Sequence, residues 1–333
     1  MATPRITVVV PAYNAEATIE TALGSLLAQT CREFEVVVVD DGSTDTTAAI
    51  VEHMAAGATV PVRLVRRAHG GRAAARDSGI TATDAEFVGF VDADDTAEPV
   101  MYERLLARAD ATGADLVVCE YVAVDGRTGE VMWSYPEGDA SLYGAGVAQR
   151  PGLLSAIAGS VCNKLVARRL FTDAGIDFPP DRDFEDLATV YRLMGEARRI
   201  EKVAEPLYRY RQGRGSSVMG ARDERYLEIF DALDVTNGHF ERSGRFEELR
   251  ADLERISFAH LIAGRLDDLL RHGDRALRHR FIERAFSHMD RFFPGWRRDE
   301  VIRAACGRRT KHAVCTSRTL LALYTDLRAE RRR

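Results

Sequence analysis

The sequence is poor in the features that mark secreted, zinc-bound or membrane-spanning proteins. Its 333 residues include five cysteines, an odd number without a CxxC pair, which argues against a disulfide framework or a zinc site. The first apolar run, residues 6–10, stops at Pro11, and no stretch approaches the ~20 apolar residues that span a bilayer. We therefore expect no transmembrane segment and a cytoplasmic protein, working in the cytosol or at the inner membrane surface.

An excess of charge of one sign is also absent. The formal net charge is only −5, so the chain as a whole does not indicate nucleic-acid binding. With 46% hydrophobic and 29% charged residues, it has the composition of a globular protein with a sizeable core. Its length suits one large domain with an appendage, or two domains.

Two common nucleotide-binding motifs are missing. Residues 11–14 read Pro-Ala-Tyr-Asn, where a dinucleotide-binding fold would place GxGxxG, and no Walker lysine motif occurs. A nucleotide site in this chain must therefore use other residues.

Apolar runs alternate with helical periodicity over the first 119 residues. This alternation predicts right-handed βαβ crossovers and an α/β fold with a mainly parallel central sheet. Ligands of such sheets lie beyond the carboxyl ends of the strands, which is where the acidic residues of this sequence gather. The expected strands are residues 6–10, 34–39, 62–65, 87–91 and 116–119, and the expected helices are 16–29, 44–54 (capped by Ser43 or Thr44), 73–80 and 100–111.

The rest of the chain changes character twice. Residues 125–160 are rich in Gly, Ser and Pro and indicate a loop and β-ribbon, and residues 183–198 have helical periodicity. From about residue 221 onward the pattern is helical with little strand signal. We therefore expect a catalytic domain over residues 1–220 and a helical C-terminal region over residues 221–333.

The densest chemical signal is Asp92-Ala93-Asp94-Asp95, which directly follows an apolar strand. Three carboxylates so close together repel one another unless a hard cation lies among them, and Mg²⁺ or Mn²⁺ binds one or two carboxylates together with phosphate oxygens. Such a cation would stabilise a diphosphate leaving group. The alternative is a solvated acidic turn that caps the helix after Pro99.

Other polar groups lie where the neighbouring strands end. Tyr13 could stack on a nucleobase and Asp40 could accept a hydrogen bond from a base N–H, or they could be a packing aromatic and an Asx turn. Glycines 70 and 71 would let a ligand approach the backbone, with Arg72 or Arg76 facing a base or phosphate, or they could form a loop with solvated arginines.

A further acidic string, residues 183–186, stands at a predicted helix start. The macrodipole would keep a carboxylate ionised there, which suits a general base that takes a proton from a hydroxyl group. Ordinary N-capping is the alternative.

Taken in order, these strings resemble the family 2 glycosyltransferases, which have the GT-A nucleotide-binding fold. The resemblance covers residues 5–217, about two thirds of the chain. The similar segments are 6–14 (opening VSVVVPAYN), 36–45 (second strand and turn), 70–79 (G-x-x-x-ARN-x-G), 88–95 (FLDSDD), 163–165 (a KL string), 185–193 (ED helix) and 207–217 (YR-x-x-x-x-S). One departure is Asp77, which stands where the family usually has Asn.

The resemblance implies roles for particular residues. Asp186 would be the catalytic base, assisted or positioned by Glu185, and Asp94 would be the principal ligand of Mn²⁺ or Mg²⁺, with Asp92 beside it. The remaining residues expected to bind the nucleotide sugar are Pro11, Ala12, Tyr13, Asn14, Asp40, Asp41, Gly70, Arg76, Asp92, Ala93, Asp95, Lys164, Arg211 and Ser217.

The implied activity is an inverting, metal-dependent hexosyl transfer. A nucleotide diphosphate sugar, with a UDP-sugar as the leading expectation, would donate to a hydroxyl group of a glycan, a lipid-linked intermediate or a natural product. The alternatives are a non-catalytic nucleotide-sugar-binding protein and a sugar nucleotidyltransferase. The second would carry a Gly-rich loop and a basic residue after the first strand, which residues 11–16 lack.

The helical C-terminal region has three candidate roles besides simple packing: acceptor recognition, homodimer formation and contact with a membrane surface. Phe292, Phe293 and Trp296 stand beside Arg297 and Arg298 and motivate the idea of peripheral membrane contact. Core packing is the expected role of these aromatic residues.

Overall fold

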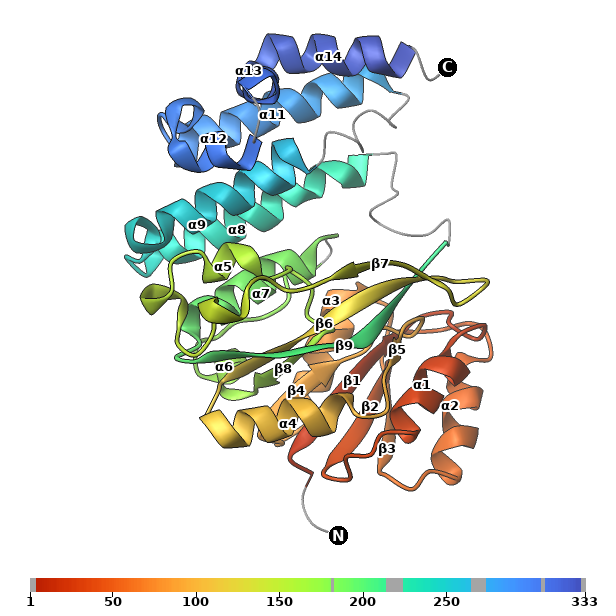
Figure 1. Ribbon diagram of the computed structural model, residues 1–333. Helices are drawn as coiled ribbons and strands as arrows, with labels where there is room; N and C mark the ends of the chain where they lie inside the picture. Colours follow the sequence, from red (N-terminus) through yellow and green to blue (C-terminus); the bar gives the residue numbers. More distant parts are fainter. Residues whose placement is uncertain (1–3, 181–182, 214–223, 265–273, 307–308, 331–333) are drawn as a thin grey trace. The chain divides into compact units, whose positions relative to one another are not determined.

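The computed structural model describes residues 4–180, 183–213, 224–264, 274–306 and 309–330 (Figure 1). The chain divides into two compact units, Met1–Gly215 and Ser216–Arg333. The first unit is α/β and the second is helical, as the sequence predicts.

The first unit opens with strands that alternate with helices. The strands β1 and β2 are apolar and buried along nearly their whole length, which is typical of parallel strands covered on both faces. In register, Val8 lies beside Val36 of β2 and Gly89 of β4. The elements in order are β1 (Ile6–Ala12), α1 (Ile19–Leu27), β2 (Phe34–Asp40), α2 (Thr47–Ala56), β3 (Val62–Arg66), α3 (Gly71–Thr81), β4 (Phe87–Phe90), β5 (Thr96–Ala97) and α4 (Met101–Thr112).

The second half of the unit returns into the same sheet. It contains β6 (Leu116–Asp125), β7 (Val131–Tyr135), η1 (Ala140–Leu142), η2 (Val147–Gln149), α5 (Leu153–Ala156), β8 (Lys164–Ala167), α6 (Arg169–Thr172), α7 (Glu185–Glu196) and β9 (Ile200–Gln212). The described residues form a nine-stranded sheet in the order β3-β2-β1-β4-β8-β6-β9-β5, with β7 paired to β6. Strand β8 is antiparallel to both of its neighbours, β4 and β6, so these two strands run in the same direction. Strands β1, β2, β3 and β9 also run in that direction, and the sheet is therefore mainly parallel, as predicted.

Helix α3 packs unusually close to the sheet. A Cβ atom on Gly79 would lie 2.3 Å from Cγ1 of Val9 in β1, so only glycine allows this approach. The predicted cap of α2 is wrong in detail: the helix begins at Thr47, and the carboxylate of Asp45, not Ser43 or Thr44, accepts a hydrogen bond from the Thr47 N–H (3.0 Å).

The second unit contains α8 (Ile229–Arg242), α9 (Phe246–Phe258), α11 (Arg275–Phe292), α12 (Glu300–Cys306), α13 (Arg309–Thr316) and α14 (Arg318–Glu330), together with short turns η4 (Glu224–Glu228), η5 (Ala259–Ala263) and η6 (Trp296–Arg298). Phe292, Phe293 and Trp296 are buried, which confirms core packing for them and removes them as a membrane-contact surface. Over the described part of the chain, no helix has the length and apolarity needed to cross a membrane.

Candidate active site

One buried arginine stands at the centre of the candidate site. The side chain of Arg76 projects from α3, is fully buried, and places Nη2 2.8 Å from Oδ1 of Asp92. Its Nη1 lies 2.8 Å from Oε1 of Glu185 and also contacts Oδ1 of Asp186, at the start of α7. The guanidinium therefore joins the acidic motif after β4 to the acidic start of α7, two segments that lie far apart in the sequence.

A second arginine, one helical turn earlier, supports the same carboxylates. Arg72 Nε lies 2.7 Å from Oε1 of Glu185, and its Nη1 lies 3.8 Å from Oδ2 of Asp92. Residues four apart share one face of a helix, so α3 presents both guanidinium groups to the site. Two cations thus face three carboxylates, and the cluster retains a net negative charge.

The electrostatics of this cluster shift the pKa values of Asp186 and Asp92 in opposite directions. Burial raises the pKa of Asp186 to about 6, against the favourable charge of Arg76 and with the added repulsion of Glu185. Burial alone would also raise the pKa of Asp92, but Arg76 and Arg72 hold it below its usual range. A carboxylate with a pKa near 6 is mostly ionised at neutral pH yet basic enough to accept a proton, which is the property of a general base.

Asp95, at the end of the acidic motif, is bound from β9. Its Oδ2 accepts a hydrogen bond from the hydroxyl of Tyr208 (2.5 Å), and its Oδ1 accepts one from the N–H of Arg211 (2.7 Å). Burial raises the pKa of Asp95 well above its usual value, and the charges of Asp92 and Asp94 raise it further. The three carboxylates therefore repel one another, as the sequence predicts.

The carboxylates of the acidic motif are side chains of the type that binds a divalent cation. In the described residues, no group of three or more His, Cys, Asp or Glu side chains forms a ready metal cage. Mg²⁺ and Mn²⁺ need no such cage when phosphate oxygens and water complete their shell, and one or two carboxylates suffice. Asp94 and Asp92 stay the predicted ligands of such an ion.

Strands β1, β2 and β3 bring the proposed nucleoside residues together. Pro11 and Ala12 end β1 and are buried, while Tyr13 follows them with 48% of its surface exposed. The Tyr13 ring stacks on that of His69, with centroids 4.1 Å apart. The sequence assigned His69 no role; here it makes, with Tyr13, an exposed aromatic pair at the carboxyl end of the sheet.

The loops that follow these strands are tied to one another. Asn14 has a left-handed backbone (φ 46°), its N–H donates to Oγ of Ser43 (3.0 Å), and its Oδ1 accepts from the N–H of Thr44 (2.8 Å). Asp40 accepts from the N–H of Ser43 (3.0 Å), which is the Asx turn that was the alternative for this residue. Asn14 and Asp40 thus shape this loop, whatever they contact in a ligand.

Asp41 organises the start of α3. It is buried, and its carboxylate accepts hydrogen bonds from the N–H groups of Gly70 (3.1 Å) and Gly71 (2.8 Å) and pairs with Arg67 (2.6 Å). The loop before α3 is therefore held by a side chain at the end of β2. Direct contact of Asp41 or Gly70 with a nucleotide sugar stays a prediction.

Two of the predicted basic contacts are directed into the protein. Nζ of Lys164 is fully buried and donates to the carbonyls of Ala158 (3.0 Å) and Ser160 (2.6 Å) and to Oδ1 of Asn163 (2.9 Å). The guanidinium of Arg211 donates to the carbonyl of Gly126. Both stay predicted donor-binding residues, but their present partners give them loop-holding roles, and Ser217 lies outside the described residues.

Sequence reasoning assigned no site role to three neighbours of the site. Cys162 places Sγ 4.0 Å from Nη2 of Arg76, and the ring of Phe178 lies 5.3 Å from the Arg76 guanidinium carbon. Tyr208 was visible only as part of the YR string. All three come from the second half of the unit, whose packing on α3 and β4 no local pattern predicts.

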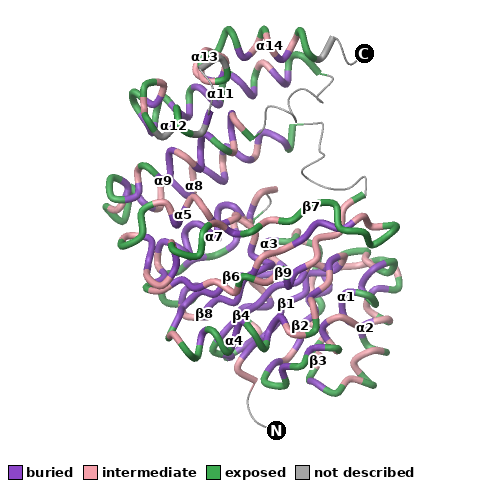
Figure 2. Tube along the Cα trace, in the orientation of Figure 1, coloured by how far each residue is buried: buried purple, intermediate pink, exposed green. Residues whose placement is uncertain are grey.

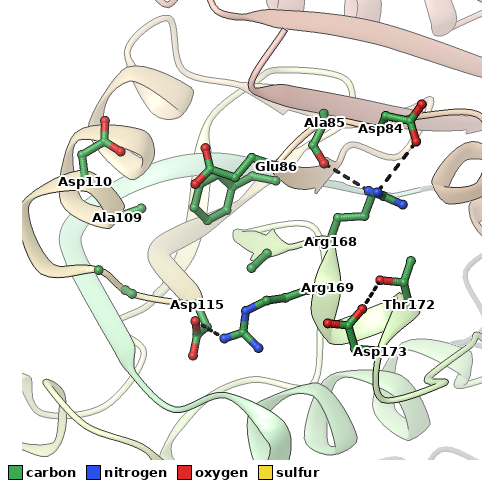
Figure 3. A pocket seen from close by; sticks show the side chains of 14 residues that line it. Asp84, Ala85, Glu86, Ala109, Asp110, Asp115, Arg168, Arg169, Thr172 and Asp173 are labelled. Atoms are coloured by element: carbon green, nitrogen blue, oxygen red, sulfur yellow. Dashed lines mark hydrogen bonds and ion pairs between the residues drawn. The ribbon is translucent and has the colours of Figure 1, made fainter. Parts of the chain in front are cut away.

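A cavity of about 500 Å³ lies elsewhere on this unit (Figure 3). It opens at the beginning of β4, whereas the acidic motif follows the end of that strand. Its two arginines are paired within it: Arg169 contacts Asp115, and Arg168 lies 3.8 Å from Asp84 and donates a hydrogen bond to the carbonyl of Ala85 (3.2 Å). This cavity is not part of the candidate site.

Comparison with known proteins decides the family. Residues 7–171 match the model of glycosyl transferase family 2. The chain is also 30% identical to the glycosyltransferase EpsH of Bacillus subtilis over 83% of its own length and 81% of EpsH. This chain belongs to glycosyl transferase family 2. It is a glycosyltransferase of the nucleotide-sugar-dependent kind, and the predicted family is confirmed.

Solved structures support the GT-A fold. TarS 1–349 of Staphylococcus aureus, in complex with UDP-GlcNAc, superimposes with a TM-score of 0.74 at 20% identity, over 98% of this chain and 91% of that one. The mannosyltransferase PcManGT of Pyrobaculum calidifontis, in complex with GDP-Man and Mn²⁺, gives a TM-score of 0.54 at 17% identity, over 99% and 88%. At such identities the similarity establishes the fold, and the predicted fold class is confirmed.

Proposed function

We propose that this chain transfers a sugar from a UDP-sugar to an acceptor hydroxyl with inversion at the anomeric carbon, and that Asp186 is the base. The observation that carries the proposal is the buried Arg76, which joins Asp92 of the acidic motif to Glu185 and Asp186. One guanidinium group would thus support both the base and the carboxylate beside the diphosphate.

The donor would lie along the carboxyl ends of the strands. Tyr13, stacked on His69, offers an exposed ring to a nucleobase, and the carboxylate of Asp40 suits a base N–H such as that of uracil. The complex of the structural neighbour TarS with UDP-GlcNAc supports a uridine donor. A divalent cation held by Asp94 with Asp92 would supply positive charge to the departing diphosphate, and the Mn²⁺ complex of PcManGT supports this assignment.

The acceptor proton goes to Asp186. Its Oδ1 faces Arg76, while among the described residues Oδ2 has one long contact, 3.4 Å from the N–H of Val161. Oδ2 is therefore the atom that can take the proton from the attacking hydroxyl. The oxygen of the acceptor hydroxyl forms the new bond to the anomeric carbon as the bond from that carbon to the diphosphate breaks. Arg76 keeps the ionised base in place.

The base assignment is tested with Asp186→Asn. This variant keeps the size and the hydrogen-bonding oxygen of the side chain but cannot accept the proton. We expect transfer and donor hydrolysis to fall at least a hundredfold, with the affinity for UDP in Mn²⁺ changed less than about threefold. Asp84→Asn is the matched control, because the Asp84 side chain is fully exposed at the opposite end of β4. Full activity of Asp186→Asn would remove Asp186 from the role of base.

A further inference from the structure

The β-ribbon beside the site carries a row of aromatic side chains on one face. Strand β6 pairs antiparallel with β7 and parallel with β9, and residues paired in register project to the same face. Tyr121 pairs with Tyr135 on one side and Tyr208 on the other, and Ala123 pairs with Trp133 and Tyr210. The aromatic face is thus Tyr121, Trp133, Tyr135, Tyr208 and Tyr210.

Three of these rings contact one another, and the aromatic face reaches solvent at β7. The ring of Tyr121 stacks on that of Tyr135 (centroids 5.3 Å apart, 21°) and meets that of Trp133 edge to face (5.8 Å, 74°). Trp133 is 40% exposed, and Figure 2 shows β7 exposed along most of its length. An exposed apolar strand at a sheet edge is a liability unless it binds something, so this exposure needs an explanation.

The aromatic face is continuous with the candidate active site. The hydroxyl of Tyr208, at one end of the row, donates to Asp95 of the acidic motif (2.5 Å). Tyr121 lies one strand further and Trp133 lies at the outer edge. The row therefore leads from the acidic motif, where the donor sugar would lie, outward to solvent. An acceptor must approach the reacting carbon from such a direction.

The chemistry of the aromatic face selects the ligand. A pyranose has a C–H face with partial positive charge, which suits the negative face of an indole or phenol ring, and a polar rim that suits phenol hydroxyls. Four of the five aromatic residues are tyrosines, so polar groups accompany the apolar surface throughout. An acyl chain would not use these hydroxyls, whereas a sugar ring would.

We propose that the aromatic face is the acceptor subsite, and that it binds a sugar ring of a glycan acceptor with Trp133 as its outer stacking surface. The proposal rests on the proposed function and deepens it, since it names a carbohydrate as the acceptor. The sugar bound at Trp133 would lie outward from the residue that receives the transferred sugar, which implies an oligosaccharide rather than a small alcohol.

Tryptophan fluorescence gives a direct test. The chain has two tryptophans, and Trp296 is only 1% exposed, so a ligand-dependent change reports on Trp133. The probes are four uncharged tetrasaccharides: cellotetraose, N-acetylchitotetraose, maltotetraose and α-1,6-mannotetraose. We expect a saturable change with at least one of them in the wild type and none in Trp133→Phe. By calorimetry, Trp133→Ala should bind that tetrasaccharide about tenfold more weakly.

Ser134→Ala is the matched control, because Ser134 adjoins Trp133, pairs with Val122 and so lies on the opposite face of the same exposed strand. It should bind the tetrasaccharide as the wild type does. Circular dichroism spectra that match the wild type would show that each variant is folded. Equal tetrasaccharide affinity in Trp133→Ala and the wild type would overturn the proposal.

Two further arms separate this proposal from its alternatives. If no tetrasaccharide binds while UDP in Mn²⁺ does, the acceptor subsite is wrong and the proposed donor function stands; if UDP does not bind either, the proposed function fails as well. Vesicles of phosphatidylcholine and phosphatidylglycerol form the second arm. A Trp133 signal with vesicles and none with tetrasaccharides would make this face a membrane contact and overturn the proposal.

Discussion

Nη2 of Arg76 lies 2.8 Å from Oδ1 of Asp92, and Arg76 has no exposed surface. A buried arginine between carboxylates from two distant segments fixes the distance between those segments. Removal of one partner from such a cluster leaves uncompensated buried charge, which is costlier than the loss of the contact itself. The Arg76–Asp92 pair is therefore both a structural joint and an electrostatic element of the site.

The first prediction concerns Arg76→Lys. Lysine keeps the charge but cannot place two separate nitrogens on Asp92 and on Glu185. We expect kcat/KM to fall at least a hundredfold, and the free energy of unfolding to fall by about 2 to 4 kcal/mol. Arg72→Lys is the comparison, since Arg72 faces the same carboxylates but is 42% exposed. This variant should lose less kcat/KM and less free energy of unfolding than Arg76→Lys. Equal effects of the two variants would show that Arg76 is not the central cation.

The second prediction concerns the cation. In the wild type, Mn²⁺ should strengthen UDP binding at least tenfold over binding in EDTA, because the ion links diphosphate and carboxylate. Asp94→Ala should bind UDP equally with and without Mn²⁺ in isothermal titration. Asp84→Ala serves as the control for the loss of one negative charge. A Mn²⁺ effect retained in Asp94→Ala would transfer the ligand role to another residue.

The third prediction is a pH profile. Asp186 must be ionised to accept a proton, and its pKa is raised to about 6. The rate of transfer should therefore fall as pH drops through about 6, tenfold per pH unit well below it. Above that value the rate should level off. A rate that stays constant down to pH 4.5 would contradict a base with this pKa.

The fourth prediction uses the departure at Asp77. Burial raises its pKa to about 6, while its Oδ1 accepts from the N–H of Phe178 (3.2 Å). Since the folded pKa exceeds the unfolded one, the native state loses stability as pH rises from about 4 to 6 and recovers none above. Asn keeps the accepting oxygen without the charge. Asp77→Asn should thus stabilise the protein at pH 7.5 by about 1 to 2 kcal/mol, after allowance for solvent screening.

Thermal unfolding of Asp77→Asn and wild type at pH 7.5 and pH 4 measures this difference. The melting temperatures should differ at the higher pH and converge at the lower one. A stabilisation of the same size at both values would mean that the charge of Asp77 is not its cause.

The fifth prediction compares two helix glycines. In α3, Gly79→Ala should destabilise the protein by about 1 to 3 kcal/mol, because the new Cβ would lie 2.3 Å from Val9. In α1, Gly24→Ala meets nothing within 4 Å and should stabilise by about 0.5 to 1 kcal/mol. Urea unfolding of both variants checks the opposite signs. Two variants of the same sign would show that the α3–β1 approach is looser than described.

The sequence predicts the first half of the catalytic unit well and the second half poorly. Strands such as β1 and β2 are continuous buried apolar runs, so local pattern suffices for them. No expectation covered β8 or β9. The KLVA run of β8 is four residues long, and β9 alternates charged and apolar residues because part of it is exposed. Their places in the sheet depend on pairing with strands far away in the chain.

The site shows the same division. Asp92, Asp94, Glu185 and Asp186 could be identified from motif strings, but their common partner could not. Arg76 was expected at the nucleoside, whereas its guanidinium is bound by Asp92, Glu185 and Asp186. Only the three-dimensional approach of α3 to α7 shows this. The nucleoside role of Arg76 stays a prediction, and any such contact would have to be made from within this cluster.

The place of β9 in the sheet has a consequence for the order of folding. Asp95 receives its hydrogen bonds from Tyr208 and Arg211, which follow it by 113 and 116 residues. Strand β5, just after the motif, pairs with β9. Loop closure over such separations is slow, and a chain emerging from the ribosome cannot complete these pairs until residue 211 is free. The nucleoside half can assemble early, but the acidic motif stays without its final support until nearly the whole catalytic unit has been synthesised, so a half-made chain would not yet be able to act on the cell's sugar donors.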